Sequence, residues 1–464
     1  MSNLNKLSIT EAASKLQAGE ITAVDLARAC LAEIKNRNKD LNAYLEVFDD
    51  VEEQARVADE RRKAGESHPL LGIPLAIKDN ILIKDRRSSA ASKMLENYVA
   101  TYDATVITKL KEAGAVFIGR TNMDEFALGG STENSAFGVT KNPHDETRVA
   151  GGTSGGSAAA VAAGMALGAL GTDTGGSVRN PASFCGVVGL KPTYGSVSRF
   201  GVIAAVSSFD QVGPIAKTIE DAEIILTAIQ GKDQFDSTSI DGNLYPKHAE
   251  KKVIGIIEGL AESKVATIED AKRKDLEAQG HTVKTISLPS LKFALAAYYI
   301  TNFAEVSSNL SRFDGVRYGL SLKGDSLVDD YAKSRAEGFG AETRRRILLG
   351  TYVLSAGYYD AYYGKAGLAR EQLRREYEKA FEEVDVIMTP TMPDVAWKIG
   401  EKEDPLSAYL ADIFTVPANL TGNPAISIPA GLIDGLPVGI QLTAAHGDEA
   451  ALFRVGKTLL GETK

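Results

Sequence analysis

The segment Asp-Thr-Gly-Gly-Ser, which ends at Ser177, is the part of the chain best suited to nucleophilic chemistry. Gly175 and Gly176 have no side chains, so successive backbone N–H groups can converge on a point beside the Ser177 hydroxyl. Converging N–H groups are what stabilises the oxyanion of a tetrahedral intermediate. The segment therefore predicts acyl transfer with Ser177 as the nucleophile.

The base that would activate Ser177 is expected to be a lysine. The five histidines lie in polar, turn-like contexts, so a Ser-His-Asp hydrolase is disfavoured. A lysine can accept a proton when burial lowers its pKa from about 10.4. Lys78 closes a short apolar run and is the candidate, and a hydroxyl of Thr153 or Ser154 could bridge it to Ser177.

Other interpretations of the same glycine-rich stretch involve no catalysis. Taken alone, residues 151–157 suit a loop that caps a helix, and residues 175–177 suit a tight turn. A phosphate cradle is disfavoured because the Lys-Ser/Thr of a P-loop is missing. A non-catalytic scaffold that binds an anion stays as an alternative. Cys185 has no basic neighbour to hold a thiolate and no metal-binding motif is visible, so thiol and metal catalysis are disfavoured.

The composition is that of a globular protein, with 464 residues of which 44% are hydrophobic and 24% charged. A net charge of −9 disfavours direct binding of nucleic acid. Two cysteines are too few for a disulfide framework. The N-terminus has no apolar leader, and the apolar stretch 158–170 is shorter than the roughly 20 residues that cross a bilayer. We therefore expect a cytoplasmic or organelle-matrix protein with no membrane partner.

The elements that must position these residues alternate between helix and strand. Residues 1–65 predict a helical outer layer, with a capping box between Thr22 and Asp25. The uniformly small and apolar residues 157–170 predict a helix packed on every side.

Residues 290–380 predict a helical elaboration of the core, and residues 381–464 predict strands and a helix that return to the core. Strand patterns at 71–78 and 116–126 flank a helix pattern, and residues 252–289 predict a strand–helix–strand unit. The fold class is α/β, with a mixed central sheet covered by helices on both faces.

Three motifs, in this order, resemble those of the amidase signature family. They are GIPLAIKDN, which contains Lys78, GGTSGGSAAA, which contains Thr153, and GTDTGGSVRNPA, which contains Ser177. Members of that family use a serine nucleophile, a bridging serine and a lysine on an α/β core. The resemblance implies one large catalytic domain over residues 1–464, with the lysine and serine motifs in a core at 66–215.

The resemblance also assigns roles to individual residues. Lys78 falls on the family lysine and Ser177 on the nucleophile. Thr153 falls on the bridging serine and departs from it by one methyl group, with Ser154 as the secondary candidate. The oxyanion-hole backbone falls on Thr174, Gly175 and Gly176.

Within that family the chain is similar to the A subunits of amidotransferases that act on glutamyl-tRNA(Gln) or aspartyl-tRNA(Asn). The likeness covers nearly the whole length and includes NMDEFALGGSTENSAFG, GLKPTYGSVSRFG and RRILLGTYVLSAGYYDAYY. It implies a glutaminase that passes ammonia to a B-type partner, which amidates a mischarged tRNA with ATP and Mg²⁺. A small C-type subunit completes the heterotrimer. The chain itself would hold no cofactor and would meet tRNA only through its partner.

This likeness also assigns a substrate-binding role to three more residues. Tyr298, Arg346 and Asp412 match the glutamine-binding positions. A guanidinium can hold an α-carboxylate bidentately and a carboxylate can accept from an α-ammonium group. The alternative is a free-standing amidase of the same family that acts on small aliphatic or aryl amides. The pair of Arg346 and Asp412 discriminates between the two, because a hydrophobic amide gives neither charge a partner.

Overall fold

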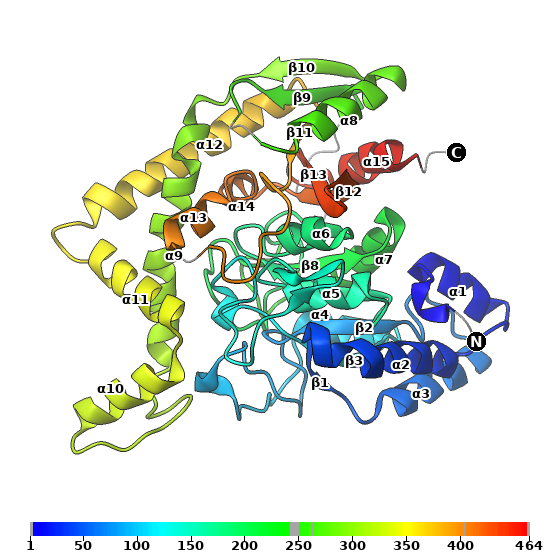
Figure 1. The fold of residues 1–464 in the computed structure, drawn as a ribbon, viewed down its shortest axis with the longest axis horizontal. Helices are drawn as coiled ribbons and strands as arrows, with labels where there is room; N and C mark the ends of the chain where they lie inside the picture. The colour runs from blue at the N-terminus through cyan, green and yellow to red at the C-terminus, as the bar shows by residue number, and fades with distance from the viewer. Residues whose placement is uncertain (1–2, 242–249, 261–262, 403, 462–464) are drawn as a thin grey trace.

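The computed structural model describes residues 3–241, 250–260, 263–402 and 404–461. One mixed sheet of eleven strands runs through the described part of the chain (Figure 1). The predicted α/β class, with helices flanking a large mixed sheet, is confirmed. The strands, in spatial order, are β1 (Tyr44–Val47), β3 (Val116–Thr121), β2 (Pro74–Lys78), β6 (Gly168–Asp173), β8 (Gln211–Ala216), β7 (Val188–Lys191), β12 (Ala425–Ile433), β13 (Leu436–Ala444), β11 (Val386–Pro390), β9 (Val253–Ile257) and β10 (Thr282–Ile286).

The helices divide between the sheet and an arm at one side. Helices α9 to α12 form the arm, where residues 290–380 were predicted to be helical, and Figure 1 shows them beside the sheet. Within the described residues, no helix is both long and apolar enough to cross a membrane. The helices are α1 (Ile9–Gln17), α2 (Ala23–Leu41), α3 (Val51–Lys63), α4 (Thr105–Glu112), α5 (Gly155–Ala162), α6 (Arg179–Cys185), α7 (Ile219–Ile229), α8 (Ala266–Ala278), α9 (Ala294–Asn309), α10 (Leu327–Gly338), α11 (Ala341–Val353), α12 (Lys365–Phe381), α13 (Pro405–Leu410), α14 (Val416–Thr421) and α15 (Glu449–Leu460).

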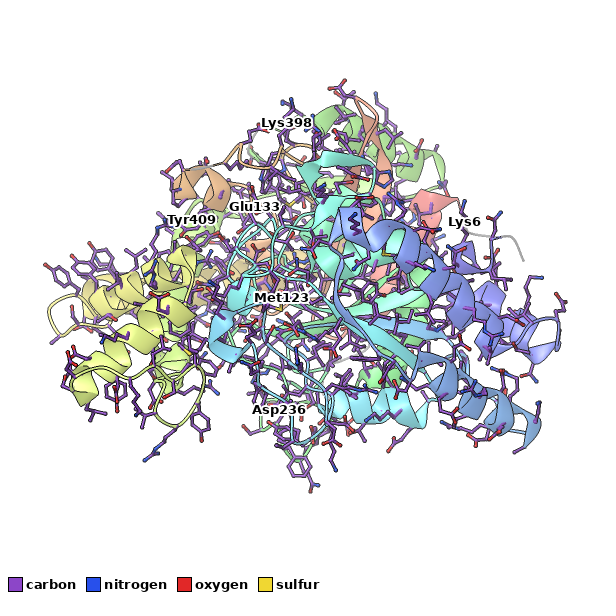
Figure 2. The ribbon with its side chains drawn as sticks, turned by 60° about the horizontal axis from the view of Figure 1, so that its bottom comes forward. Lys6, Met123, Glu133, Asp236, Lys398 and Tyr409 are labelled. Atoms are coloured by element: carbon purple, nitrogen blue, oxygen red, sulfur yellow. The ribbon has the colours of Figure 1, made fainter. Side chains whose placement is uncertain are left out.

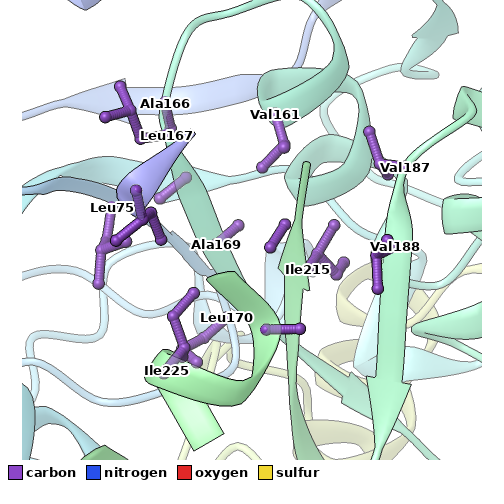
Figure 3. Close-up of a cluster of buried hydrophobic side chains, with 14 of the residues drawn as sticks. Leu75, Val161, Ala166, Leu167, Ala169, Leu170, Val187, Val188, Ile215 and Ile225 are labelled. Atoms are coloured by element: carbon purple, nitrogen blue, oxygen red, sulfur yellow. The ribbon is translucent and has the colours of Figure 1, made fainter. Parts of the chain in front are cut away.

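Strands β2 and β6 bring the two chemical motifs together. They are parallel neighbours, with Leu75 opposite Gly168 and Ile77 opposite Leu170. Every residue of both strands is buried, and Figure 3 shows Leu75, Ala169 and Leu170 within one apolar cluster. The carboxyl ends of parallel strands meet at the same edge of a sheet. Lys78 at the end of β2 therefore lies close to the loop that follows β6.

Two local predictions are wrong. Residues 157–170 do not form one helix, because α5 ends at Ala162 and β6 begins at Gly168. Gly164, with φ at 74°, takes the left-handed conformation that ends the helix. A uniformly apolar stretch has no periodicity that separates a buried helix from a buried strand. Residues 44–47, predicted within a helical layer, form edge strand β1 against β3. The capping box at Thr22 and the 253–286 strand–helix–strand unit are confirmed.

Candidate active site

Lys78 is fully buried and surrounded by hydroxyl groups. Its Nζ lies 2.6 Å from Thr153 Oγ1, 2.9 Å from Ser154 Oγ and 2.8 Å from Thr172 Oγ1. Burial lowers the pKa of Lys78 to about 7, while the charges of more distant carboxylates oppose that change. Lys78 can therefore be neutral near pH 7 and accept a proton, as a general base must.

Both bridging candidates reach Lys78, and their other contacts distinguish them. The Ser154 hydroxyl donates to the Thr172 carbonyl at 3.2 Å and accepts from the Thr172 N–H at 3.3 Å, so it ties α5 to β6. The Thr153 hydroxyl has Lys78 as its hydrogen-bond partner in the described part of the chain. Thr153 therefore keeps a proton and a lone pair for a second partner, which a relay requires.

Ser177 lies in the turn between β6 and α6 and faces a cavity. The Ser154 N–H donates to the Ser177 carbonyl at 3.0 Å, which holds the nucleophile segment against the Thr153 segment. The described residues show no hydrogen bond between the Ser177 hydroxyl and Thr153. The Lys78–Thr153 half of the relay is thus present, and the Thr153–Ser177 half stays a prediction.

A buried ion pair shapes the predicted oxyanion loop. Asp173 accepts from the Gly176 N–H at 2.9 Å and from the Val178 N–H at 3.2 Å. Arg179 donates to both carboxylate oxygens of Asp173, at 3.0 and 2.9 Å. Burial would raise the pKa of Asp173, but the charge and hydrogen bonds of Arg179 hold it below its usual range. The N–H of Gly176 already has an acceptor, so the N–H groups of Thr174, Gly175 and Ser177 are the ones left to test as oxyanion donors.

Two side chains from distant parts of the chain rest on this loop. Thr415 donates to the Gly175 carbonyl at 2.6 Å. The Tyr298 hydroxyl lies so close to Gly175 that a Cβ there would overlap it, which makes glycine the residue that fits. Tyr298 therefore touches the predicted oxyanion loop as well as the cavity.

The cavity beside Ser177 is lined by residues that lie far apart in the sequence. Ser177, Tyr298, Arg346 and Asp412 all line it, and its own free volume is about 10 Å³. An adjoining outer chamber of about 280 Å³ shares Arg346 and Asp412 with it. Figure 2 labels two other residues of the outer chamber, Glu133 and Tyr409. The three residues predicted to bind the amide donor are thus brought together with the predicted nucleophile.

Arg346 is held with one edge toward the cavity. Its Nε donates to Glu342 at 2.7 Å and its Nη1 to Asn302 at 3.1 Å. The Tyr409 hydroxyl also donates to Glu342 at 2.7 Å. Burial would lower the pKa of Arg346, but Glu342 raises it above its usual range, so the guanidinium stays charged. The Nη2 group has no hydrogen-bond partner within the described residues and can meet a carboxylate.

Asp412 supplies a carboxylate on the same cavity. Tyr299 donates to Asp412 at 2.6 Å. Burial raises the pKa of Asp412 to about 7, against the influence of the Tyr299 hydrogen bond and the charge of Arg346. A cation such as an α-ammonium group would favour the ionised form, because an opposite charge lowers a carboxyl pKa.

Several functional side chains were not predicted from the sequence. Asp173 and Arg179 are two of the few ionic residues between 151 and 193, and that isolation is a usable signal. Glu342 stands four residues before Arg346, a spacing at which side chains on a helix meet. Nothing in the sequence pointed to Tyr299, which reaches Asp412 across 113 residues of chain.

Alternative chemistries find no support in the described residues. Burial raises the pKa of the Cys185 thiol well above its usual value, so a thiolate is disfavoured. No group of three or more His, Cys, Asp or Glu side chains in the described ranges could hold a metal ion.

Comparisons with known proteins identify the family of the chain. The amidase family model matches residues 25–453. The A subunit of the glutamyl-tRNA(Gln) amidotransferase of Desulfatibacillum aliphaticivorans is 51% identical over 98% of this chain and 96% of its own length. Its counterpart in Coxiella burnetii is 49% identical over 99% and 98%.

Solved structures extend the comparison. The A subunit of the glutamyl-tRNA(Gln) amidotransferase of Thermotoga maritima is 39% identical, covers 99% of this chain and 95% of its own, and superposes with a TM-score of 0.81. A peptide amidase of Stenotrophomonas maltophilia is 29% identical, covers 99% and 97%, and has a TM-score of 0.83. The chain belongs to the amidase family, whose signature motifs its own motifs resemble.

Proposed function

We propose that the chain is the glutamine-hydrolysing subunit of a tRNA-dependent amidotransferase. The observation that carries the proposal is the cavity that Ser177 lines together with the charge pair Arg346 and Asp412. That pair matches the α-carboxylate and α-ammonium groups of glutamine. The relatives near 50% identity carry the name of the A subunit of glutamyl-tRNA(Gln) amidotransferase, which favours this function over that of a free-standing amidase.

The proposed reaction runs through an acyl-enzyme. The Ser177 oxygen attacks the side-chain amide carbon while its proton passes by way of Thr153 to neutral Lys78. Backbone N–H groups of the loop before Ser177 hold the oxyanion. The C–N bond then breaks, and ammonia leaves with the proton that Lys78 returns. Water hydrolyses the ester to glutamate by the same relay.

The proposal is tested by the charge dependence of the substrate. We expect Arg346→Ala to raise KM for glutamine by roughly 10- to 100-fold with kcat nearly unchanged, because charge-assisted hydrogen bonds are worth about 1.5–3 kcal/mol. The α-carboxylate does not change during the reaction, so Arg346 contributes uniform binding. The measurement is steady-state ammonia release from glutamine.

Butyramide serves as the control substrate because it has no charged group. Its kcat/KM should be the same in Arg346→Ala and the parent chain, which also shows that the variant folds. An unchanged KM for glutamine, or a parent chain that prefers butyramide, would favour the free-standing amidase.

The proposal includes partners. A B-type subunit would use the ammonia to amidate glutamyl-tRNA(Gln) or aspartyl-tRNA(Asn), with ATP and Mg²⁺ bound there, and a small C-type subunit would complete the assembly. We propose that the reaction takes place in the cytoplasm or in an organelle matrix. The two cysteines, buried and unpaired, suit a reducing compartment.

The aromatic hairpin, residues 347–364 at the end of α11 and after it, is the surface we assign to a partner subunit. Asp360 is its one charged residue. Leu348 is 70% exposed and Tyr352 46% exposed, and the Tyr352 ring lies 4.3 Å from that of Tyr358. Protein interfaces are enriched in tyrosine and depleted of charge at their centres, and contiguous exposed apolar patches mark them.

Leu348→Asp should weaken the affinity for the B-type subunit by at least about tenfold, as expected for a residue at an interface centre. Val328→Asp is the matched control, because Val328 is 73% exposed on α10, outside the hairpin. Butyramide turnover by the free chain should be unaffected in both. Equal affinity of the two variants, measured by titration calorimetry, would move the interface elsewhere.

A further inference from the structure

Helix α11 begins without a cap from its own sequence. Its N-cap residue is Gly340, which has no side chain to accept from the first N–H groups. The N–H groups of the first helical turn have no partner within the helix, so their acceptors come from water or from other parts of the chain. This matters for the site, because α11 carries both Glu342 and Arg346.

Glu125 supplies the missing acceptor from the core of the molecule. Its Oε2 accepts from the Gly340 N–H at 2.8 Å and from the Thr343 hydroxyl at 2.5 Å. Its Oε1 accepts from the Ser92 hydroxyl at 2.5 Å. Glu125 is buried, and a Cβ on Gly340 would lie 2.8 Å from its Oε2, so glycine is what admits the carboxylate. The start of α11 is therefore fixed to the core by one side chain.

The neighbouring residue, Asp124, fixes a second segment that lines the site. Asp124 accepts from the N–H groups of Ser131, Thr132 and Asn134 at 3.3, 2.8 and 3.1 Å. These bonds shape the glycine loop 129–134, whose first residue lines both chambers. Figure 2 shows Met123, the residue before Asp124, between the helical arm and the sheet. The consecutive carboxylates of Asp124 and Glu125 therefore position two separate segments that line the site, the loop 129–134 and the start of α11.

From this arrangement we infer that Glu125 is a positioning residue for the amide donor: by anchoring the first turn of α11 it sets where Arg346 meets the donor's carboxylate. Arg346 lies about one and a half turns beyond the anchored end of α11. Its Nε donates to Glu342, which belongs to the first turn, so the position of that turn determines the position of the guanidinium. The inference rests on the proposed function, because it concerns a donor with an α-carboxylate.

The test compares Glu125→Gln with the parent chain on glutamine and on butyramide. Glutamine at position 125 keeps one acceptor oxygen and loses the charge, so the first turn of α11 loosens. We expect KM for glutamine to rise about five- to tenfold, the equivalent of losing one helix cap. The kcat for glutamine and the kcat/KM for butyramide should change less than about twofold, because Ser177, Thr153 and Lys78 lie on other elements.

A second readout measures binding without turnover. Glutamine should protect Ser177 from a fluorophosphonate probe, and the concentration needed for half protection should rise by the same factor in Glu125→Gln. Glu337→Gln is the matched control, since Glu337 is exposed near the end of α10 and only three residues before Gly340. Thr343→Val, which removes one of the two bonds to Glu125 Oε2, should shift KM in the same direction by a smaller factor.

The outcomes separate the inference from the proposed function. A parent chain that turns over butyramide but neither hydrolyses nor binds glutamine contradicts the proposed function. A parent chain active on glutamine whose Glu125→Gln form has the parent KM contradicts the inference alone. Equal losses on glutamine and butyramide would show a general structural role and also overturn it. If Glu125→Gln does not fold, Thr343→Val decides by the same comparison.

Discussion

Thr153→Ala is expected to lower kcat by roughly 10²- to 10⁴-fold, the range for loss of a general acid–base step. The Thr153 hydroxyl lies 2.6 Å from Lys78 Nζ and has no second partner in the described residues. Removing it would leave Lys78 without a path to Ser177. Ser154→Ala should reduce kcat far less, because its hydroxyl is engaged by the Thr172 backbone.

Steady-state kinetics of the two alanine variants decide the assignment, with circular dichroism to establish that both fold. Thr153→Ser keeps the hydroxyl and should retain activity. A large loss in Ser154→Ala with Thr153→Ala spared would transfer the bridging role to Ser154.

The second large effect is expected from pH. Lys78 acts as a base only when neutral, and its pKa is lowered to about 7 by burial. Below pH 7 the neutral fraction falls about tenfold for each unit, so kcat/KM at pH 5 should be about 100-fold below its plateau. Above pH 7 the rate should level off, because the lysine is already deprotonated.

The pH profile should be measured with butyramide. Burial raises the pKa of Asp412 to about 7, so glutamine binding would add its own titration in the same range. Butyramide has no charge for Asp412 to meet, which isolates the relay. A profile still rising up to pH 10 would show that Lys78 keeps the pKa of an ordinary lysine and is not the base.

The sequence indicated which residues could carry the chemistry, but it did not show the contacts that support them. Lys78, Thr153 and Ser177 lie in glycine-rich or apolar motifs whose residue types already restrict the chemistry. Strands with alternating or continuous apolar residues, such as 253–257 and 436–444, were also predictable from pattern. These features depend on local sequence, which a single chain displays directly.

What escaped prediction depends on contacts between distant residues. The bond from Tyr299 to Asp412 and the bond from Gly340 to Glu125 join segments that only the folded chain brings together. The break between α5 and β6 escaped for a different reason, because small apolar residues suit a buried helix and a buried strand equally. Burial of Lys78, which sets its pKa, likewise follows from the whole fold.

The ion pair between Asp173 and Arg179 has a consequence for the field at the oxyanion. A lone carboxylate bound to the Gly176 N–H would act as a monopole that repels the negative charge developing beside Ser177. The bidentate guanidinium, with both side chains fully buried, converts that monopole into a compact dipole. A dipole field falls more steeply with distance, so Asp173 can shape the loop by its hydrogen bonds without opposing the transition state.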